Sequence, residues 1–313
     1  MDGHKSEAQP GGSMACEVSP LEDADPRTIG GYPLLGRIGT GGMGTVFLAR
    51  EPDTSERVAV KTIHPRLAGD AKFRERLREE AVMASRVASF CTARVLDYGE
   101  DASGLPYIVS EYVGGMSLQR RLLQSGPLPA ADLHGVAVGV AAGLSAVHAA
   151  GLIHGDVKPA NVILTLSGPR VIDFGVSRKC DSPSPAPSGT VVGTPGWVPP
   201  EVIRGGPPTP AADVFGWGCL VAYAGTGRLP FGEGEPTEVA LRTANEEPDL
   251  SDVPPDLLPT VRAALAKNPL ERPTAPDLLL SLVGYPASPE PTPAVPASAE
   301  EPPEETKEFS AVA

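Results

Sequence analysis

Hydrophobic positions divide the chain into a front part with short apolar runs and a back part with longer periodic segments. Residues 32–50 carry two short apolar runs on either side of a glycine cluster, and a third run, RVAVKTI, follows the turn residues EPDTSE. Apolar runs separated by turn residues are typical of antiparallel strands. We therefore expect a strand meander here, with further strands over 93–100 and 106–113.

Apolar residues three or four positions apart predict helices in the other segments. The first helix is expected over 71–87, where Phe73, Leu77, Ala81, Ala84 and Val87 recur among charged residues. From about residue 117 onward the long periodic segments are helical, over 132–151, 213–227, 235–247, 257–267 and 275–284. A strand-rich front and a helix-rich back, joined near 113–115, predict an α+β protein.

The length and composition indicate a globular protein with acidic ends. The 313 residues are 41% hydrophobic, which is enough for a sizeable core. The segments 1–30 and 286–313 are acidic, and the second is also rich in proline, so both are expected to be disordered tails. The net charge of −13 argues against a nucleic-acid partner, because nucleic-acid surfaces are basic.

Cysteine spacing and hydropathy predict a cytoplasmic protein. Cys16, Cys91, Cys180 and Cys219 have no spacing typical of a metal site or a redox pair, so we expect reduced thiols. No stretch approaches the roughly 18 apolar residues of a membrane span. The N-terminus also lacks the apolar run of a signal peptide.

A glycine cluster is the first candidate binding feature. Gly39, Gly41 and Gly44 form a G-x-G-x-x-G pattern, which by itself is weak evidence. The pattern leads into the strand TVFLAR and not into a helix, which favours a glycine loop inside a hairpin that covers phosphate groups. A plain hairpin turn is the alternative.

Two charged residues at strand ends are further candidates. Lys61 ends the strand RVAVK, where a buried ammonium needs a counter-charge; Glu80 on the first helix is the expected partner, and Glu79 is the alternative. An edge-strand lysine with its head in water would fit the residue type equally well. Asp173 follows an apolar strand, which suits a metal ligand, although such residues are more often turn or cap residues.

The stretch LIHGDVKPANVIL, residues 152–164, places four polar side chains between two apolar runs. We call residues 154–161, with His154, Asp156, Lys158 and Asn161, the polar loop. Asp and Asn favour loops through local hydrogen bonds, so this segment alone does not establish a site.

Taken together, these motifs resemble those of the protein kinase family, in particular the bacterial Hanks-type serine/threonine kinases. The resemblance runs from about residue 31 to 282 and includes GTGGMGTV, VAVK, the helix glutamate, HGDVKPAN, DFG, GTPGWVPPE, DVFGWG and the ERP around Arg272. It implies a two-lobed protein kinase fold. The strand-rich N-lobe with one helix would span 31–113, and the helical C-lobe would span 114–285.

The resemblance also implies roles for the matching residues. Asp156 would accept or orient the proton of the substrate hydroxyl, and Lys158 would neutralise charge on the transferred phosphoryl group. Lys61, paired with Glu80, would hold the phosphates of ATP. The implied ATP-binding residues are Ile38, Gly39, Thr40, Gly41, Gly42, Met43, Gly44, Val46, Ala59, Lys61, Glu111, Val113 and Ile163. Among them, Val46, Ala59 and Ile163 would pack against the adenine ring, and the backbone of Glu111 and Val113 would hydrogen-bond its edge.

The implied cofactors are ATP and Mg²⁺, with Mn²⁺ as a substitute for Mg²⁺. Asn161 and Asp173 would bind the metal ion. The positions of Lys158 and Thr194 are more similar to the pattern of serine/threonine kinases than to that of tyrosine kinases. The implied substrates are therefore serine or threonine hydroxyl groups of proteins. A homodimer would allow autophosphorylation in trans. Glu201 and Arg272 would form a structural ion pair.

The chain departs from the family pattern at three positions. Gly155 replaces the Arg that usually precedes the catalytic Asp, which makes the chain a non-RD type and suggests that phosphorylation of the following loop is not its switch. Ser110 implies a large back pocket beside the adenine site. Pro199 stands where a small residue is more usual, and the sequence offers no reason for it. The candidate phosphorylation sites are Thr190 first, then Ser188 and Thr194, with Ser182 and Ser184 in the same segment.

Two other functions remain open at the level of sequence. Small-molecule phosphotransferases share the fold and often carry HGD, but they are expected to have His where Lys158 stands. A catalytically inactive scaffold is the second alternative, although every catalytic position is filled.

Overall fold

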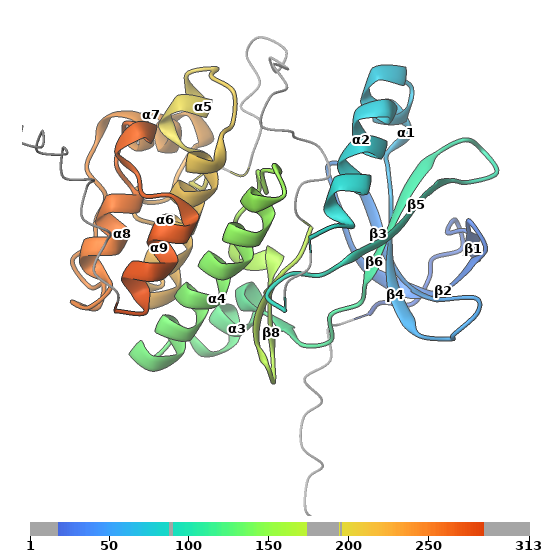
Figure 1. The fold of residues 1–313 in the computed structure, drawn as a ribbon, viewed down its shortest axis with the longest axis horizontal. Helices are drawn as coiled ribbons and strands as arrows, with labels where there is room; N and C mark the ends of the chain where they lie inside the picture. Colours follow the sequence, from blue (N-terminus) through green and yellow to red (C-terminus); the bar gives the residue numbers. More distant parts are fainter. Residues whose placement is uncertain (1–17, 88–89, 174–193, 195, 285–313) are drawn as a thin grey trace, which may run out of the picture.

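The computed structural model describes residues 18–87, 90–173, 194 and 196–284, and these form two lobes (Figure 1). The first lobe is built on an antiparallel six-stranded sheet with strand order β1-β2-β3-β4-β6-β5. Its elements are β1 (Thr28–Ile29), β2 (Tyr32–Gly41), β3 (Gly44–Arg50), β4 (Arg57–Thr62), α1 (Pro65–Ala68), α2 (Ala71–Ala84), β5 (Val95–Glu100) and β6 (Pro106–Glu111). The predicted meander corresponds to β2, β3 and β4.

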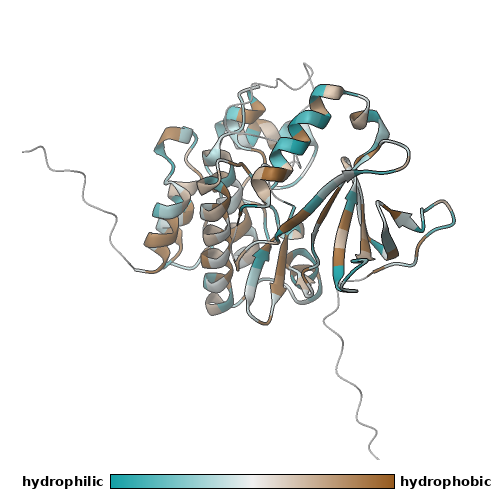
Figure 2. Cartoon of the chain, turned by 45° about the vertical axis from the view of Figure 1, so that its right-hand side comes forward, coloured by the Kyte–Doolittle hydropathy of each residue, from teal (hydrophilic) through white to brown (hydrophobic). Residues whose placement is uncertain are grey.

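Alternation of side chains builds the core of this sheet. In β4, Val58 and Val60 are buried and Arg57 is exposed, as expected for a strand with one face in the core. The two valines pack with Phe47 of β3 and Val109 of β6. Figure 2 shows hydrophobic colouring along these central strands. The sheet therefore forms a firm support for residues at the strand ends.

Helix α2 connects the sheet to the second lobe. The carboxylate of Asp70 caps its N-terminus by accepting a 2.9 Å hydrogen bond from Lys72 N. The buried face carries residues at the predicted helical spacing, including Leu77. Leu77 belongs to a core that also contains Val147 and Leu152, so the two lobes share apolar contacts behind the site.

The second lobe is mainly helical. Its elements are β7 (Met116–Ser117), α3 (Leu118–Ser125), α4 (Ala130–Ala149), η1 (Pro159–Asn161), β8 (Val162–Thr165), β9 (Gly168–Val171), α5 (Pro200–Ile203), α6 (Pro210–Thr226), α7 (Pro236–Asn245), α8 (Leu258–Ala264), η2 (Pro269–Glu271) and α9 (Ala275–Leu282). The strands β7, β8 and β9 form a separate small sheet. The five helices predicted for this part correspond to α4, α6, α7, α8 and α9.

Helices α4 and α6 form the centre of this lobe. Phe215 and Trp217 of α6 are fully buried. The indole N–H of Trp217 donates a 2.9 Å hydrogen bond to the carbonyl oxygen of Ala137 in α4, which satisfies a polar group in the core. The ring of Phe215 stacks on Phe231 with centroids 5.8 Å apart. The N-terminal end of α6 thus provides a rigid base near the polar loop.

One described helix, α4, is long and apolar enough by composition to cross a bilayer, which the sequence analysis did not expect. Half of its apolar window is buried inside the protein. The helix packs against α6, α9 and β9. These contacts are those of a core helix in the second lobe.

The segment 18–30 differs from the sequence interpretation, which assigned all of 1–30 to a disordered tail. Ser19 and Arg37 exchange two backbone hydrogen bonds of 2.8 Å each. Asp25 is buried and accepts hydrogen bonds from Arg37 Nε and Nη2, both at 2.8 Å. The acidic side chain that suggested a solvated tail therefore neutralises an arginine of β2. Residues 1–17 and the predicted tail 286–313 lie outside the described residues.

Candidate active site

A cavity of about 650 Å³ is lined by residues of both lobes, and its size is typical of small-molecule sites. One wall comes from β2, β3, β4 and the end of β6, and the other comes from the polar loop, β8 and the residues after β9. The lining includes the sequence-predicted residues Ile38, Gly39, Thr40, Gly41, Gly42, Met43, Gly44, Val46, Ala59, Lys61, Glu111, Val113, Asp156, Lys158, Asn161, Ile163, Asp173 and Thr194.

The glycine cluster forms the hairpin turn between β2 and β3. A Cβ atom added at Gly39, Gly41 or Gly42 would meet no atom within 4 Å. At Gly44 it would lie 1.7 Å from the carbonyl oxygen of Thr62, so only glycine allows this close approach of two strands. Because most of its residues are glycines, this turn allows phosphate groups to approach its backbone N–H groups.

Lys61 and Asp173 come together inside the cavity. Lys61 Nζ lies 3.2 Å from Asp173 Oδ2, and the two side chains are 17% and 35% exposed. Asp173 has a φ of 60°, a left-handed conformation whose strain is typical of functional sites. On α2, Glu80 is fully buried and Glu79 is exposed, so Glu80 is the glutamate that faces the interior. The pairing of Lys61 with Glu80 stays a prediction.

The polar loop gathers its carboxylate, ammonium and amide around one point. Lys158 Nζ lies 2.7 Å from Asp156 Oδ2 and donates a 3.1 Å hydrogen bond to Thr194 Oγ1. Asn161 Nδ2 donates to the backbone oxygen of Asp156 at 2.8 Å and to its Oδ2 at 3.1 Å. Because the amide nitrogen faces Asp156, the Asn161 Oδ1 atom remains available to a metal ion.

The buried carboxylate of Asp213, at the start of α6, holds the polar loop from below. Its Oδ2 accepts a 2.8 Å hydrogen bond from His154 N and lies 2.7 Å from His148 Nε2. Its Oδ1 accepts a 2.8 Å hydrogen bond from Gly155 N. Gly155 has a φ of 75°, a left-handed conformation that glycine adopts without strain. The backbone conformation therefore gives a physical reason for glycine beside Asp156, which the sequence analysis did not find.

His154 links the polar loop to the residue before Asp173. Its Nδ1 accepts a 3.2 Å hydrogen bond from Asp156 N, and its Nε2 lies 3.1 Å from the carbonyl oxygen of Ile172. These partners require a neutral ring that carries its proton on Nε2. Burial lowers the pKa of His154 below its ordinary value, which keeps the ring neutral.

Small apolar residues line the cavity beside the end of β6. Val46, Ala59 and Ile163 are the three residues predicted to contact an adenine ring. Sequence reasoning missed Ala93 and Ile172, which line the same cavity. Both are apolar side chains that carry no chemical signal of their own, so only the fold reveals them. Tyr112, Ala160 and His154 complete the lining together with Ser110 and Gly155.

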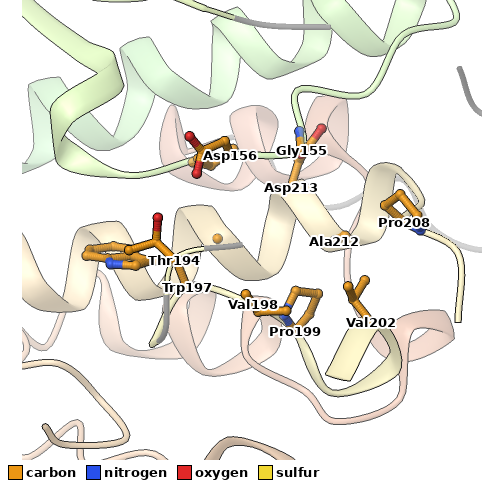
Figure 3. A pocket seen from close by; sticks show the side chains of 12 residues that line it. Gly155, Asp156, Thr194, Trp197, Val198, Pro199, Val202, Pro208, Ala212 and Asp213 are labelled. Carbon is orange, nitrogen blue, oxygen red and sulfur yellow. The ribbon is translucent and has the colours of Figure 1, made fainter. Parts of the chain in front are cut away.

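A second, much smaller hollow of about 30 Å³ lies under the polar loop (Figure 3). Pro199 lines it and is the residue before α5, with φ −76° and ψ 159°. An extended residue is what the following proline, Pro200, requires, and proline itself fits this φ. The conformation therefore accounts for Pro199, the departure that the sequence left unexplained.

The pair predicted between Glu201 and Arg272 is present. Arg272 Nη1 and Nη2 donate to the two carboxylate oxygens of Glu201 at 2.7 and 2.8 Å, and the Arg272 side chain is fully buried. Arg272 also donates to three backbone oxygens around it. This pair lies away from the large cavity, as expected for a structural contact.

Of the candidate phosphorylation sites, only Thr194 can be described. Its hydroxyl group accepts the hydrogen bond from Lys158, which favours a role in holding this lysine. Ser182, Ser184, Ser188 and Thr190 lie outside the described residues.

Comparison with known proteins identifies the family to which a chain with this site belongs. The model of the protein kinase domain family matches residues 32–282. The chain belongs to the protein kinase family. This kinase chain is 42% identical over 265 residues to the probable serine/threonine-protein kinase PkwA of Thermomonospora curvata, covering 85% of this chain and 35% of that protein. It is 38% identical over 269 residues to the serine/threonine-protein kinase AfsK of Streptomyces coelicolor, covering 86% and 33%.

Solved structures support the same family. The crystal structure of the PknI kinase domain from Mycobacterium tuberculosis matches this kinase with a TM-score of 0.64 and 26% sequence identity, covering 82% of this chain and 96% of that one. The relatives confirm the predicted resemblance to bacterial Hanks-type serine/threonine kinases and the two-lobed fold. The chain spans about a third of the length of the curated relatives it matches.

Proposed function

We propose that this kinase chain transfers the γ-phosphoryl group of ATP to serine or threonine hydroxyl groups of proteins. The observation that carries the proposal is the single cavity in which the glycine loop, the Lys61–Asp173 pair and the polar loop face one another. Phosphoryl transfer needs cations around the transferred group and a nucleophile held in line with it. The cavity offers both kinds of group.

In this proposal Asp156 orients the substrate hydroxyl and accepts its proton. Its carboxylate is 43% exposed, so an incoming hydroxyl group has access to it. Lys158 lies 2.7 Å from that carboxylate and is held by Thr194, a position from which its ammonium would offset charge on the phosphoryl oxygens. Lys61 would contact the remaining phosphates beneath the glycine loop.

The residues present also fit Mg²⁺. This ion prefers one or two carboxylates together with phosphate oxygens and water, so a full protein cage is not needed. Asp173 supplies a carboxylate and Asn161 supplies an amide oxygen, and both line the cavity. Mg²⁺ bound there would neutralise phosphate charge, and Mn²⁺ would serve in its place.

The hydrogen bond between Lys158 and Thr194 favours a protein substrate over a small molecule. Thr194 belongs to the segment GTPGWVPPE, which leads to α5 and has no counterpart expected in small-molecule phosphotransferases. The filled catalytic positions favour an active enzyme over a scaffold. The cysteine spacing supports a cytoplasmic protein, and a homodimer would allow autophosphorylation in trans.

Incubation with labelled Mg·ATP tests the proposal. We expect label in this protein or in an added protein, and loss of that incorporation in Lys61→Ala and Asp173→Asn with the fold retained. Lys72→Ala and Asp252→Asn, which change exposed groups outside the cavity, are matched controls that should keep the incorporation. Retained labelling in either cavity variant, or label in small molecules alone, would overturn the proposal.

Gly155 further supports independence from a loop phosphate. A phosphorylated loop is usually held by an arginine at this position through charge-assisted hydrogen bonds, and glycine has no side chain for it. We expect Thr190→Ala, and a variant that also lacks Ser188, to keep the rate within a few-fold. A lag, or a tenfold rise after ATP pretreatment of dephosphorylated enzyme, would show that the loop phosphate is still read and would contradict this account of Gly155; Arg178 or Lys179 would then be the candidate partners of the phosphate.

A further inference from the structure

The two lobes are joined by hydrogen bonds beside the large cavity. Val171 N, in β9 of the second lobe, donates to the carbonyl oxygen of Cys91 at 2.7 Å. Ala93 N donates in turn to the carbonyl oxygen of Val171 at 2.9 Å. The segment 91–93, which lies between α2 and β5 of the first lobe, thus runs along β9 of the second.

Arg170, the neighbour of Val171, adds side-chain contacts to this joint. Its Nη1 and Nη2 donate to Glu111 Oε1 and Oε2 at 2.6 and 2.7 Å, and Nη2 also donates to the carbonyl oxygen of Thr92 at 2.6 Å. The Arg170 side chain is 17% exposed, and its Nε atom is buried without a hydrogen-bond partner among the described residues. One planar guanidinium therefore connects β9, the segment 91–93 and the end of β6.

The position of Glu111 makes this connection relevant to ligand binding. Glu111 is the last residue of β6 and lines the cavity, and Tyr112 and Val113 continue that lining. This stretch is also where the chain passes from the sheet to the second lobe. A bidentate arginine–carboxylate pair fixes both distance and orientation, which a lysine cannot do.

We propose that Arg170 is a positioning residue that holds residues 111–113 in the place where they bind the edge of an adenine ring. The proposal rests on the proposed function, because it assumes that ATP occupies the cavity. Arg170 itself does not line the cavity, so it would act through Glu111. Hydrogen bonds from Arg170 lower the pKa of the Glu111 carboxyl group, so the pair is ionised at neutral pH.

The test compares Arg170→Met, Arg170→Lys and Glu111→Gln with the parent. We expect Arg170→Met to raise the KM for ATP roughly tenfold with kcat within about twofold. Arg170→Lys keeps the charge but loses the bidentate geometry, so its KM should lie between those of Arg170→Met and the parent. Arg228→Met, which removes an exposed arginine bound to Asp252, is the matched control and should leave both constants unchanged.

Two inhibitors separate adenine positioning from a general loss of structure. Adenosine carries only the adenine end of the ligand, and inorganic tripolyphosphate carries only the phosphate end. We expect Arg170→Met to weaken inhibition by adenosine by the same factor as the KM for ATP and to leave inhibition by tripolyphosphate unchanged. If Arg170→Met fails to fold, Glu111→Gln, which keeps the shape of the side chain, gives the same comparison.

The outcomes are distinguishable. An unchanged KM in both Arg170→Met and Glu111→Gln, or an equal loss for adenosine and tripolyphosphate, would overturn the positioning role and leave the kinase function standing. A lowered kcat with an unchanged KM would also overturn it. A parent protein that binds neither ATP nor adenosine would overturn the proposed function and this inference with it.

Discussion

The two walls of the cavity are held in different ways. On the second lobe, the polar loop is bonded to Asp213, a carboxylate that is 2% exposed at the start of a core helix. On the first lobe, the tip of the glycine loop is held from the surface. His64 N donates to the carbonyl oxygen of Met43 at 2.7 Å, and the exposed Arg66 donates to that of Gly42 at 2.9 Å.

This difference matches what each wall is proposed to do. Reacting groups must be held within a few tenths of an ångström, and a buried carboxylate in low dielectric holds its donors strongly. A cover over phosphates must admit and release a ligand, which exposed hydrogen bonds permit. The comparison therefore predicts that substitutions at the base of the polar loop lower both the free energy of unfolding and kcat. The effect of a substitution in the glycine loop should depend on the space around the new side chain.

The largest effect is expected for Asp213→Ala. The variant leaves the N–H groups of His154 and Gly155 without their acceptor, so we expect the free energy of unfolding to fall by about 3 kcal/mol. Displacement of Asp156 should lower kcat about a hundredfold. Denaturant unfolding and initial rates measure the two effects. Asp252→Ala, which removes an exposed carboxylate, should change neither, and a normal kcat in Asp213→Ala would contradict the proposed anchoring.

The glycine loop offers a matched pair of substitutions. In Gly44→Ala the new Cβ would meet the carbonyl oxygen of Thr62, so β3 and β4 must separate, and we expect a loss of about 2 kcal/mol in the free energy of unfolding. Gly41→Ala places its Cβ in open space and should change stability by less than about 0.5 kcal/mol. Equal stabilities of the two variants would contradict this account of the loop.

The elements that sequence reasoning identified are those with a strong local pattern. Alternation predicted β4, and helical spacing predicted α2 and α6, because in each case one face enters a core. The short α3 and the strands β7 and β9 offer too few residues for a period to emerge. The strands β7 and β9 form because β8 completes their hydrogen bonds, and α3 buries Leu118 and Leu122 in the core of the second lobe.

Long-range contacts explain what the sequence could not show. Glu111 and Arg170 are 59 positions apart, and no sequence pattern around either residue predicts that they form a pair. The packing of residues 18–30 depends on Gly36, where a Cβ would lie 2.4 Å from Val18 Cγ1, and on the pairing of Asp25 with Arg37. By contrast, the order of the motifs was enough to place Asp156 and Asp173 in one site. The resemblance to the protein kinase family implied a fold in which these two motifs lie together.

Ser110 tests the first-lobe wall in another way, because the size of its side chain limits the space in the cavity next to Glu111. It lines the cavity beside Glu111, and its small size should admit ATP analogues with a bulky N6 substituent. We expect Ser110→Met to lose at least tenfold in kcat/KM for such an analogue, or about 1.4 kcal/mol in the barrier, while ATP stays within a few-fold. Use of the analogue by Ser110→Met at the parent rate would contradict the pocket.

The smallest effect concerns the ion pair between Arg170 and Glu111, the residue at the end of β6 that lines the first-lobe wall, and it depends on pH. Because Arg170 lowers the pKa of Glu111 in the folded state, this carboxylate stabilises the fold above its unfolded pKa of about 4.3, and the stabilisation is lost as the pH falls through the lower folded value. The Glu111 side chain is 39% exposed, so solvent screening limits the difference between the parent and Glu111→Gln to about 0.5 kcal/mol at neutral pH. Denaturant titrations of both proteins should show a constant difference between roughly pH 6 and 8 that shrinks below about pH 4. A difference that grows on acidification would mean that Glu111 is not held ionised by Arg170.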